Sequence, residues 1–243
     1  MRQSMDGMAR RIFSPARYYQ VAERVYRGWT SDNPYEVQWI PTDSVVRFSG
    51  RDRATRSAPL FGTVRGGDWD IEPPDYGVDC QHADLAYAPR LDETVFYRSL
   101  HARFVDGAAW EDTEFIREMR KRCRLPGFDW GSYKDQEAIT VKCVGLDAMW
   151  RDIGERGVRP YREILVAEGR KVPFLKAMAG EVLVDCGRRD LLLVDGKHRV
   201  SIAKIMGIEQ IPVVTVVRHI ASPGLAVNAI MPTKSDKARC VEE

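Results

Sequence analysis

The sequence predicts a mixed α/β domain, an α+β arrangement in which a small mixed sheet is backed by helices. Short apolar runs rich in β-branched residues alternate with longer segments whose apolar residues recur at helical spacing. The run 191–219 shows this order most clearly, as a strand, a polar turn, a helix and a second strand. The chain has 243 residues and no internal repeat, so it is long enough to bury one sizeable core.

The upstream part begins with a helix and two short strands. Ser14 and Pro15 form a good helix start, because serine caps the first N–H groups and proline fits the first turn. The apolar stripe that follows ends near Gly28. The predicted strands cover 37–40 and 60–64.

The polar segment 49–59 lies between these strands and is predicted to be a mobile loop. Its residues Arg51, Arg53 and Arg56 either stay in solvent or contact phosphates. The sequence RGGDWD at 65–70 follows the second strand.

Asp68 and Asp70, on either side of Trp69, are candidate catalytic residues because carboxylates serve as general bases or metal ligands. The alternative is a plain turn that the tryptophan anchors.

The block 92–165 is predicted to be helical and to insert into the sheet domain or cover it. Apolar residues at helical spacing mark a helix from 92 to about 105, a second after Asp112 and a third over 135–153. We expect Gly154 and Gly157 to stop the third helix. The second helix carries a basic rim at 117–124, which is either a solvated face or a surface for an acidic partner.

The last part of the chain is predicted to form the rest of the sheet. Strands at 181–186 and 191–194 form a hairpin across the loop 187–190, and a further strand covers 211–217. In the intervening helix, three polar residues are expected on one wet stripe: Lys197, Ser201 and Lys204.

The turn before that helix, Asp195-Gly196-Lys197-His198-Arg199, is the best candidate site. A helix start offers N–H groups without partners and the positive end of the dipole, so it attracts phosphate. Gly196 lets the backbone approach a ligand, and an arginine such as Arg199 grips a phosphate with two hydrogen bonds. The alternative is that Asp195 caps the helix while Lys197 and Arg199 are solvated surface charges.

The same run resembles the core motif of the ParB/sulfiredoxin-like superfamily. The residues that carry the resemblance are Asp195, Gly196, His198, Arg199, Ala203, Gly207, Ile211, Pro212 and Val213. The box is most similar to the D-G-H-H-R box of free serine kinases, from which only Lys197 differs. The resemblance covers 181–219, about a sixth of the chain. The part upstream resembles archaeal and phage proteins with the same box.

Three departures limit what the resemblance implies. Sulfiredoxins place a reactive cysteine where this chain has Lys197, so reduction of a sulfinic acid is not expected. ParB proteins have a G-E-R-R box and then a helix-turn-helix domain, for which the segment after His219 is too short. The kinases also need an acidic residue from an earlier strand region, for which Asp68 or Asp70 is the best candidate.

The resemblance and the turn together suggest a nucleotide-binding protein, kinase-like in its phosphate site. It would use ATP or ADP, or CTP, with Mg²⁺, and would transfer a phosphoryl group to a small hydroxyl-bearing molecule. Asp195 would either hold the Mg²⁺ or act as a catalytic residue that activates the hydroxyl. Backbone N–H groups from Gly196 onward would hold the oxygens, and His198 would donate to a phosphate or act as an acid or base. Ser201 is a further candidate for cofactor binding.

The alternative is a non-catalytic DNA-associated module of phage or plasmid type. It would use basic residues at 47–65 and 117–124 for backbone contacts. A net charge of +2 does not by itself argue for nucleic acid.

Composition and cysteine spacing suggest a soluble protein of one globular unit. No apolar run reaches about 18 residues, and the first residues lack a signal-peptide pattern, so a cytoplasmic location is expected. The five cysteines are dispersed, which favours reduced thiols, with Cys143 and Cys186 in the core. The predicted divisions are a helical extension at 1–35, the main domain at 36–220 and a tail at 221–243.

Overall fold

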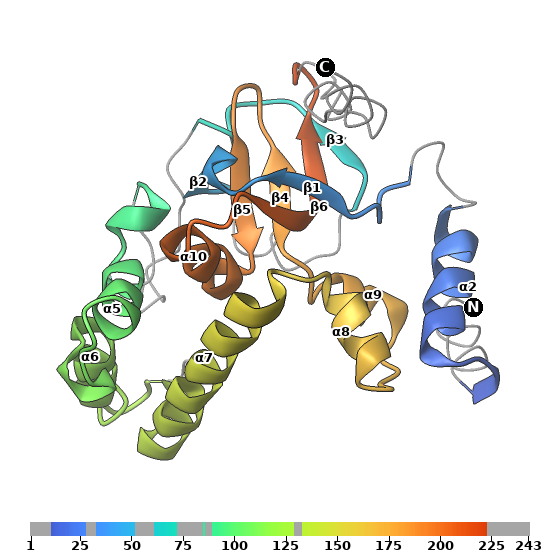
Figure 1. The fold of residues 1–243 in the computed structure, drawn as a ribbon. Helices are drawn as coiled ribbons and strands as arrows, with labels where there is room; N and C mark the ends of the chain where they lie inside the picture. Colours follow the sequence, from blue (N-terminus) through green and yellow to red (C-terminus); the bar gives the residue numbers. More distant parts are fainter. Residues whose placement is uncertain are drawn as a thin grey trace, which may run out of the picture.

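The structure is a computed structural model that describes residues 11–27, 33–51, 61–71, 85, 89–128 and 133–222. It confirms the mixed α/β class, with a six-stranded mixed sheet and helices packed against it (Figure 1). Within these residues, none of the helices has the length and apolar character needed to cross a membrane. The predicted tail lies outside the described residues from 223 onward.

The sheet is built around the long strand β6. Its order is β1-β6-β4-β5-β2, and β3 also pairs with β6. β1 with β6 and β4 with β5 are antiparallel, whereas β2 with β5, β4 with β6 and β3 with β6 are parallel. The strands are β1 (Gln38–Pro41), β2 (Val45–Phe48), β3 (Thr63–Arg65), β4 (Leu183–Cys186), β5 (Leu191–Asp195) and β6 (Gln210–His219).

The predicted hairpin is confirmed, because β4 and β5 pair antiparallel on either side of the loop 187–190. β2 was not predicted. The helices are α2 (Pro15–Arg27), α5 (Val95–Phe104), α6 (Glu114–Arg122), α7 (Gln136–Arg156), α8 (Tyr161–Ala167), α9 (Phe174–Met178) and α10 (Lys197–Ile205), with short 3-10 helices η1 (Thr42–Ser44), η2 (Leu91–Glu93) and η3 (Trp110–Asp112).

The ends of the helices follow from local capping. The Thr94 hydroxyl accepts a hydrogen bond from Tyr97 N at 3.0 Å to start α5, and the Asp135 carboxylate accepts one from Ala138 N at 2.7 Å to start α7. The prediction that Gly154 helps to stop α7 was wrong. The helix continues through Gly154, where a Cβ would make an ordinary contact with Met206 at 3.5 Å, and ends at Gly157 with φ of 70°.

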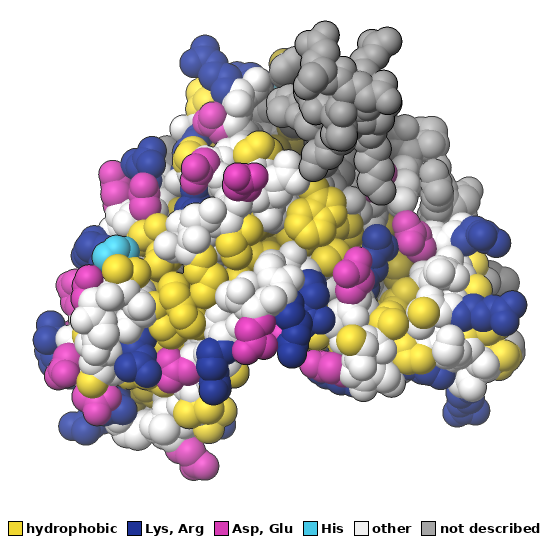
Figure 2. All heavy atoms as spheres, viewed as in Figure 1, with side chains coloured by type: hydrophobic (Ala, Val, Ile, Leu, Met, Phe, Trp, Pro, Cys, Tyr) yellow, Lys and Arg dark blue, Asp and Glu magenta, His cyan; other side chains and the backbone are white. Residues whose placement is uncertain are grey.

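Two apolar clusters hold the helices in place. The larger one joins the sheet to α5, α6, α7 and α10, and Cys143 belongs to it, as predicted. A second cluster, rich in tyrosine and phenylalanine, packs α2 against α8 and α9. Cys186 is also buried, as predicted. Figure 2 shows hydrophobic side chains gathered over the middle of the face where α10 lies in front of the sheet.

Candidate functional site

The turn between β5 and α10 is built on a left-handed glycine. Gly196 has φ of 94°, and a Cβ at this position would lie 3.1 Å from Val182 Cα. The glycine therefore permits a close approach to Val182 of the same chain. Gly196 is the N-cap residue of α10, and because glycine has no side chain it cannot cap the first N–H groups of the helix.

Asp195 lies at the solvent-facing end of β5. Its Oδ1 accepts a hydrogen bond from Gly196 N at 2.6 Å, and the side chain is exposed. The carboxylate thus shapes the turn without capping the helix in the usual manner. It remains accessible to a cation that a ligand brings with it.

His198 lies between α10, α5 and α7. Its ring packs edge-to-face on Phe96, with centroids 5.0 Å apart, and its Nε2 is shielded from solvent with no hydrogen-bond partner among the described residues. Burial lowers the pKa of His198 well below its usual value, and the positive charges of Lys142, Lys197 and Arg199 lower it further. The imidazole is therefore neutral at pH 7.

Two lysines bring positive charge to this corner. Lys197 Nζ lies 5.2 Å from the centre of the Phe96 ring, a cation–π contact. Lys142, from α7, is partly buried, which lowers its pKa, and no carboxylate of the described residues forms an ion pair with it. Sequence reasoning missed Lys142. Its position three residues after Ile139 and four before Leu146, both buried, places it at the edge of the core-facing side of α7.

Arg199 and Ser201 differ from their predicted roles. The Arg199 guanidinium donates to the carbonyl of Gly180 and faces Glu181, so it is directed into the fold. Glu181 in turn accepts hydrogen bonds from Tyr161 N at 2.6 Å and Arg162 N at 3.0 Å, which caps α8. Ser201 is fully buried, so the predicted wet stripe was wrong at this position.

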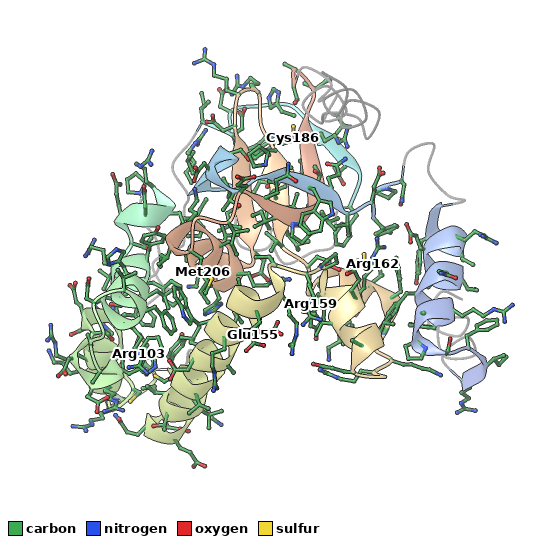
Figure 3. The ribbon with its side chains drawn as sticks, viewed as in Figure 1. Arg103, Glu155, Arg159, Arg162, Cys186 and Met206 are labelled. Carbon is green, nitrogen blue, oxygen red and sulfur yellow. The ribbon has the colours of Figure 1, made fainter. Side chains whose placement is uncertain are left out.

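Asp68 and Asp70 lie at the opposite end of β5 from the turn. Both pair with Arg188 of the β4–β5 loop, at 2.9 Å and 2.6 Å. Burial favours a raised pKa for Asp70, but the hydrogen bonds and positive charge of Arg188 outweigh it and hold that pKa at about 2. The structure therefore does not bring these carboxylates to Asp195. Figure 3 labels Cys186, which lies at the end of β4 next to the loop 187–190.

Several basic residues of the segments predicted as DNA contacts pair with carboxylates. Arg51 is buried, and its Nε donates to Asp185 at 2.6 Å. Arg47 pairs with Asp190 at 3.0 Å. On α6, Lys121 and Arg122 both pair with Glu118. Arg53 and Arg56 lie outside the described residues.

Among the residues that the structure describes, a metal site made by the protein alone is not found. Among the described residues, no three histidine, cysteine or acidic side chains are grouped so as to hold an ion. Comparison of the chain with family models, with curated proteins and with solved structures gave no match. The corner formed by α5, α7 and α10 brings Lys142 and Lys197 close to His198.

Proposed function

We propose that the protein binds the phosphates of a nucleotide at the first turn of α10. The observation that carries this proposal is the concentration of positive charge around His198. Lys142 and Lys197 lie close enough to lower the pKa of the imidazole, and Lys142 has no acidic partner in the described part of the chain. Partly desolvated like charges destabilise a fold, and an anion placed among them removes that cost.

The N-terminus of α10 also favours binding of an anion. The N–H groups of the first turn point outward along the axis and carry the positive end of the helix dipole. A phosphate at this position would accept hydrogen bonds from these groups and would lie near both lysines. A neighbouring anion would also raise the pKa of His198 and favour a proton on its Nε2.

The resemblance to the ParB/sulfiredoxin-like superfamily suggests ATP, ADP or CTP as the ligand. Asp195 fits a role in holding Mg²⁺, because Mg²⁺ is commonly bound by one or two carboxylates together with substrate phosphates. The ion would neutralise phosphate charge. The geometry supports nucleotide binding but not a catalytic role for Asp68 and Asp70, because both pair with Arg188 at the other end of β5. Phosphoryl transfer to a small hydroxyl-bearing molecule stays a prediction of the resemblance. A cytoplasmic location stays a prediction of the sequence pattern.

Isothermal titration calorimetry with ATP, ADP and CTP, each with and without Mg²⁺, tests the proposal. We expect at least one nucleotide to bind the native chain and to raise its thermal midpoint, because a ligand specific to the folded form stabilises it. Lys142→Met should weaken that binding about tenfold, the loss of one charge-assisted contact.

Lys204→Met is the matched control. It removes a lysine from the far end of the same helix, where Lys204 pairs with Asp43 at 3.4 Å. Its nucleotide affinity should equal that of the native chain. Absence of binding by all three nucleotides, or equal losses in both variants, would refute the proposal.

A further inference from the structure

We infer that the outer face of α7 associates with a second copy of this chain in an antiparallel pair. The helix has 21 residues, and its buried side consists of Ile139, Cys143, Leu146 and Ile153. The opposite side is exposed and carries apolar residues in its middle. In Figure 1 this helix projects from below the sheet, with its N-terminal half at the lower end of the molecule.

The apolar part of this face is unusual for an exposed helix. Val141 and Val144 are 66% and 62% exposed, and Ala148 follows one turn later, so the three lie on one stripe. Alternating steps of three and four residues are the spacing by which helices pair side by side. In Figure 2 the lower part of the molecule shows hydrophobic side chains beside charged ones.

Gly145 supplies a second observation. It lies in the middle of α7, where glycine costs roughly 1 kcal/mol relative to alanine. Within the described structure, a Cβ at this position would meet no atom within 4 Å, so packing inside the chain does not require a glycine. A second helix packed closely against α7 at this point would account for the glycine, because a side chain here would hold the two helices apart.

The charges at the two ends of the stripe select the partner and its direction. Toward the N-terminus the face carries Glu137, and toward the C-terminus it carries Arg151, both exposed. Glu155, one turn beyond Arg151, pairs with Arg156 of the same chain at 3.7 Å. An antiparallel pair centred near Val144 and Gly145 brings Glu137 beside Arg151 of the second copy.

A parallel pair of identical helices would place each charged residue beside the same residue of the other copy, and the two like charges would repel. The pattern is therefore complementary to itself only when one copy is reversed, which is the arrangement that a two-fold axis produces. Asp152, close to the seam, is already neutralised by Arg159 at 3.0 Å, so it adds little repulsion. These charges and the apolar centre favour a second copy over an unrelated helix.

Sedimentation velocity of the full chain over a micromolar concentration series tests the inference. We expect a reversible monomer–dimer equilibrium that weakens with added salt, because exposed ion pairs are screened. Val144→Asp should abolish the dimer while leaving the circular dichroism spectrum unchanged, since the Val144 side chain is mostly exposed in the monomer. The matched control is Val105→Asp, an equally simple change at a 55% exposed valine on another surface, and it should leave the equilibrium unchanged.

Charge reversal tests the direction of the pair. Glu137→Arg and Arg151→Glu should each weaken the dimer about tenfold, because by symmetry each replaces two attractive contacts by two repulsive ones. The double variant should recover the native dissociation constant. A chain that is monomeric at every concentration, a dimer that survives Val144→Asp, or a double variant weaker than both single ones would overturn the inference.

Discussion

The two ends of strand β5 carry similar residue types but differ in how their charged side chains are paired. At the hairpin end, acids and bases are matched, in the pairs of Arg188 with Asp70 and Asp68 and of Arg47 with Asp190. At the α10 end, Lys142 and Lys197 lie near a neutral His198, and the carboxylate of Glu181 is engaged in capping α8. The first end is neutralised by ion pairs within the chain, whereas the second keeps Lys142 without an acidic partner among the described residues.

Under the proposed function, this difference separates charges that hold the fold from charges that bind a ligand. A matched pair lowers the free energy of the folded state, so its removal should cost stability. An unmatched cation raises that free energy, so its removal should cost binding and not stability. Substitutions at the two ends of β5 should therefore have opposite effects on stability and binding.

Arg51→Met should cost about 3–5 kcal/mol of unfolding free energy, because it leaves Asp185 buried without its partner. The comparison variant is Arg47→Met, whose ion pair with Asp190 is 25% and 40% exposed. That variant should lose less than about 1 kcal/mol. Urea unfolding of both variants measures the difference. Equal losses would show that burial does not determine how much each ion pair contributes to the unfolding free energy.

Asp70→Asn should cost about 2 kcal/mol, because Arg188 holds the pKa of Asp70 at about 2 and a tenfold change in acidity corresponds to about 1.4 kcal/mol. The carboxylate is stabilised in the folded state, so its contribution is present above about pH 4 and is lost as the pH falls toward 2. Urea unfolding at a series of pH values should therefore show a weaker acid dependence in Asp70→Asn. The matched change Asp68→Asn removes an exposed carboxylate that also pairs with Arg188, so it should cost less than about 1 kcal/mol of unfolding free energy.

The sequence allowed much of the fold to be predicted where contacts are local. The loop 187–190 between two apolar runs identified the β4–β5 hairpin, and the spacing of Ile139, Cys143 and Leu146 identified α7. β2 was not predicted because it has only four residues and pairs parallel with a strand far along the chain. Length and periodicity do not reveal such a pairing.

The candidate site was predicted in place but not in its details. The turn at Asp195 and Gly196 and the helix after it were found from their residues. The roles of Arg51 and Arg199 were not, because each binds an atom contributed by another segment, Asp185 and the carbonyl of Gly180 respectively. Lys142 was missed for the same reason, since only the packing of α7 on α10 brings it to the corner.

Lys142→Met should separate stability from binding at the α10 end. We expect the unfolding free energy to stay constant or rise by up to about 1 kcal/mol, because a partly desolvated cation is removed from beside other positive charges. The nucleotide affinity should fall about tenfold over the same change. Urea unfolding and calorimetry on one preparation give both values, and a variant that loses stability would place Lys142 among the charges that hold the fold.

The smallest expected effect is a pH dependence of anion binding through His198. Its folded-state pKa lies below the value of about 6.5 in an unfolded chain, so its contribution to stability is present above that pH and declines as the pH falls. An anion at the first turn of α10 raises that pKa, so proton and anion should bind cooperatively.

Sulfate is the suitable probe because its charge stays constant between about pH 7 and 5.5. We expect about threefold tighter binding of sulfate at the lower pH, since protonation of His198 adds one favourable charge near the anion. His101→Asn, at an exposed histidine near Asp106, should keep this dependence, whereas His198→Asn should abolish it. A sulfate affinity that is the same at both pH values in the native chain would separate His198 from the phosphate site.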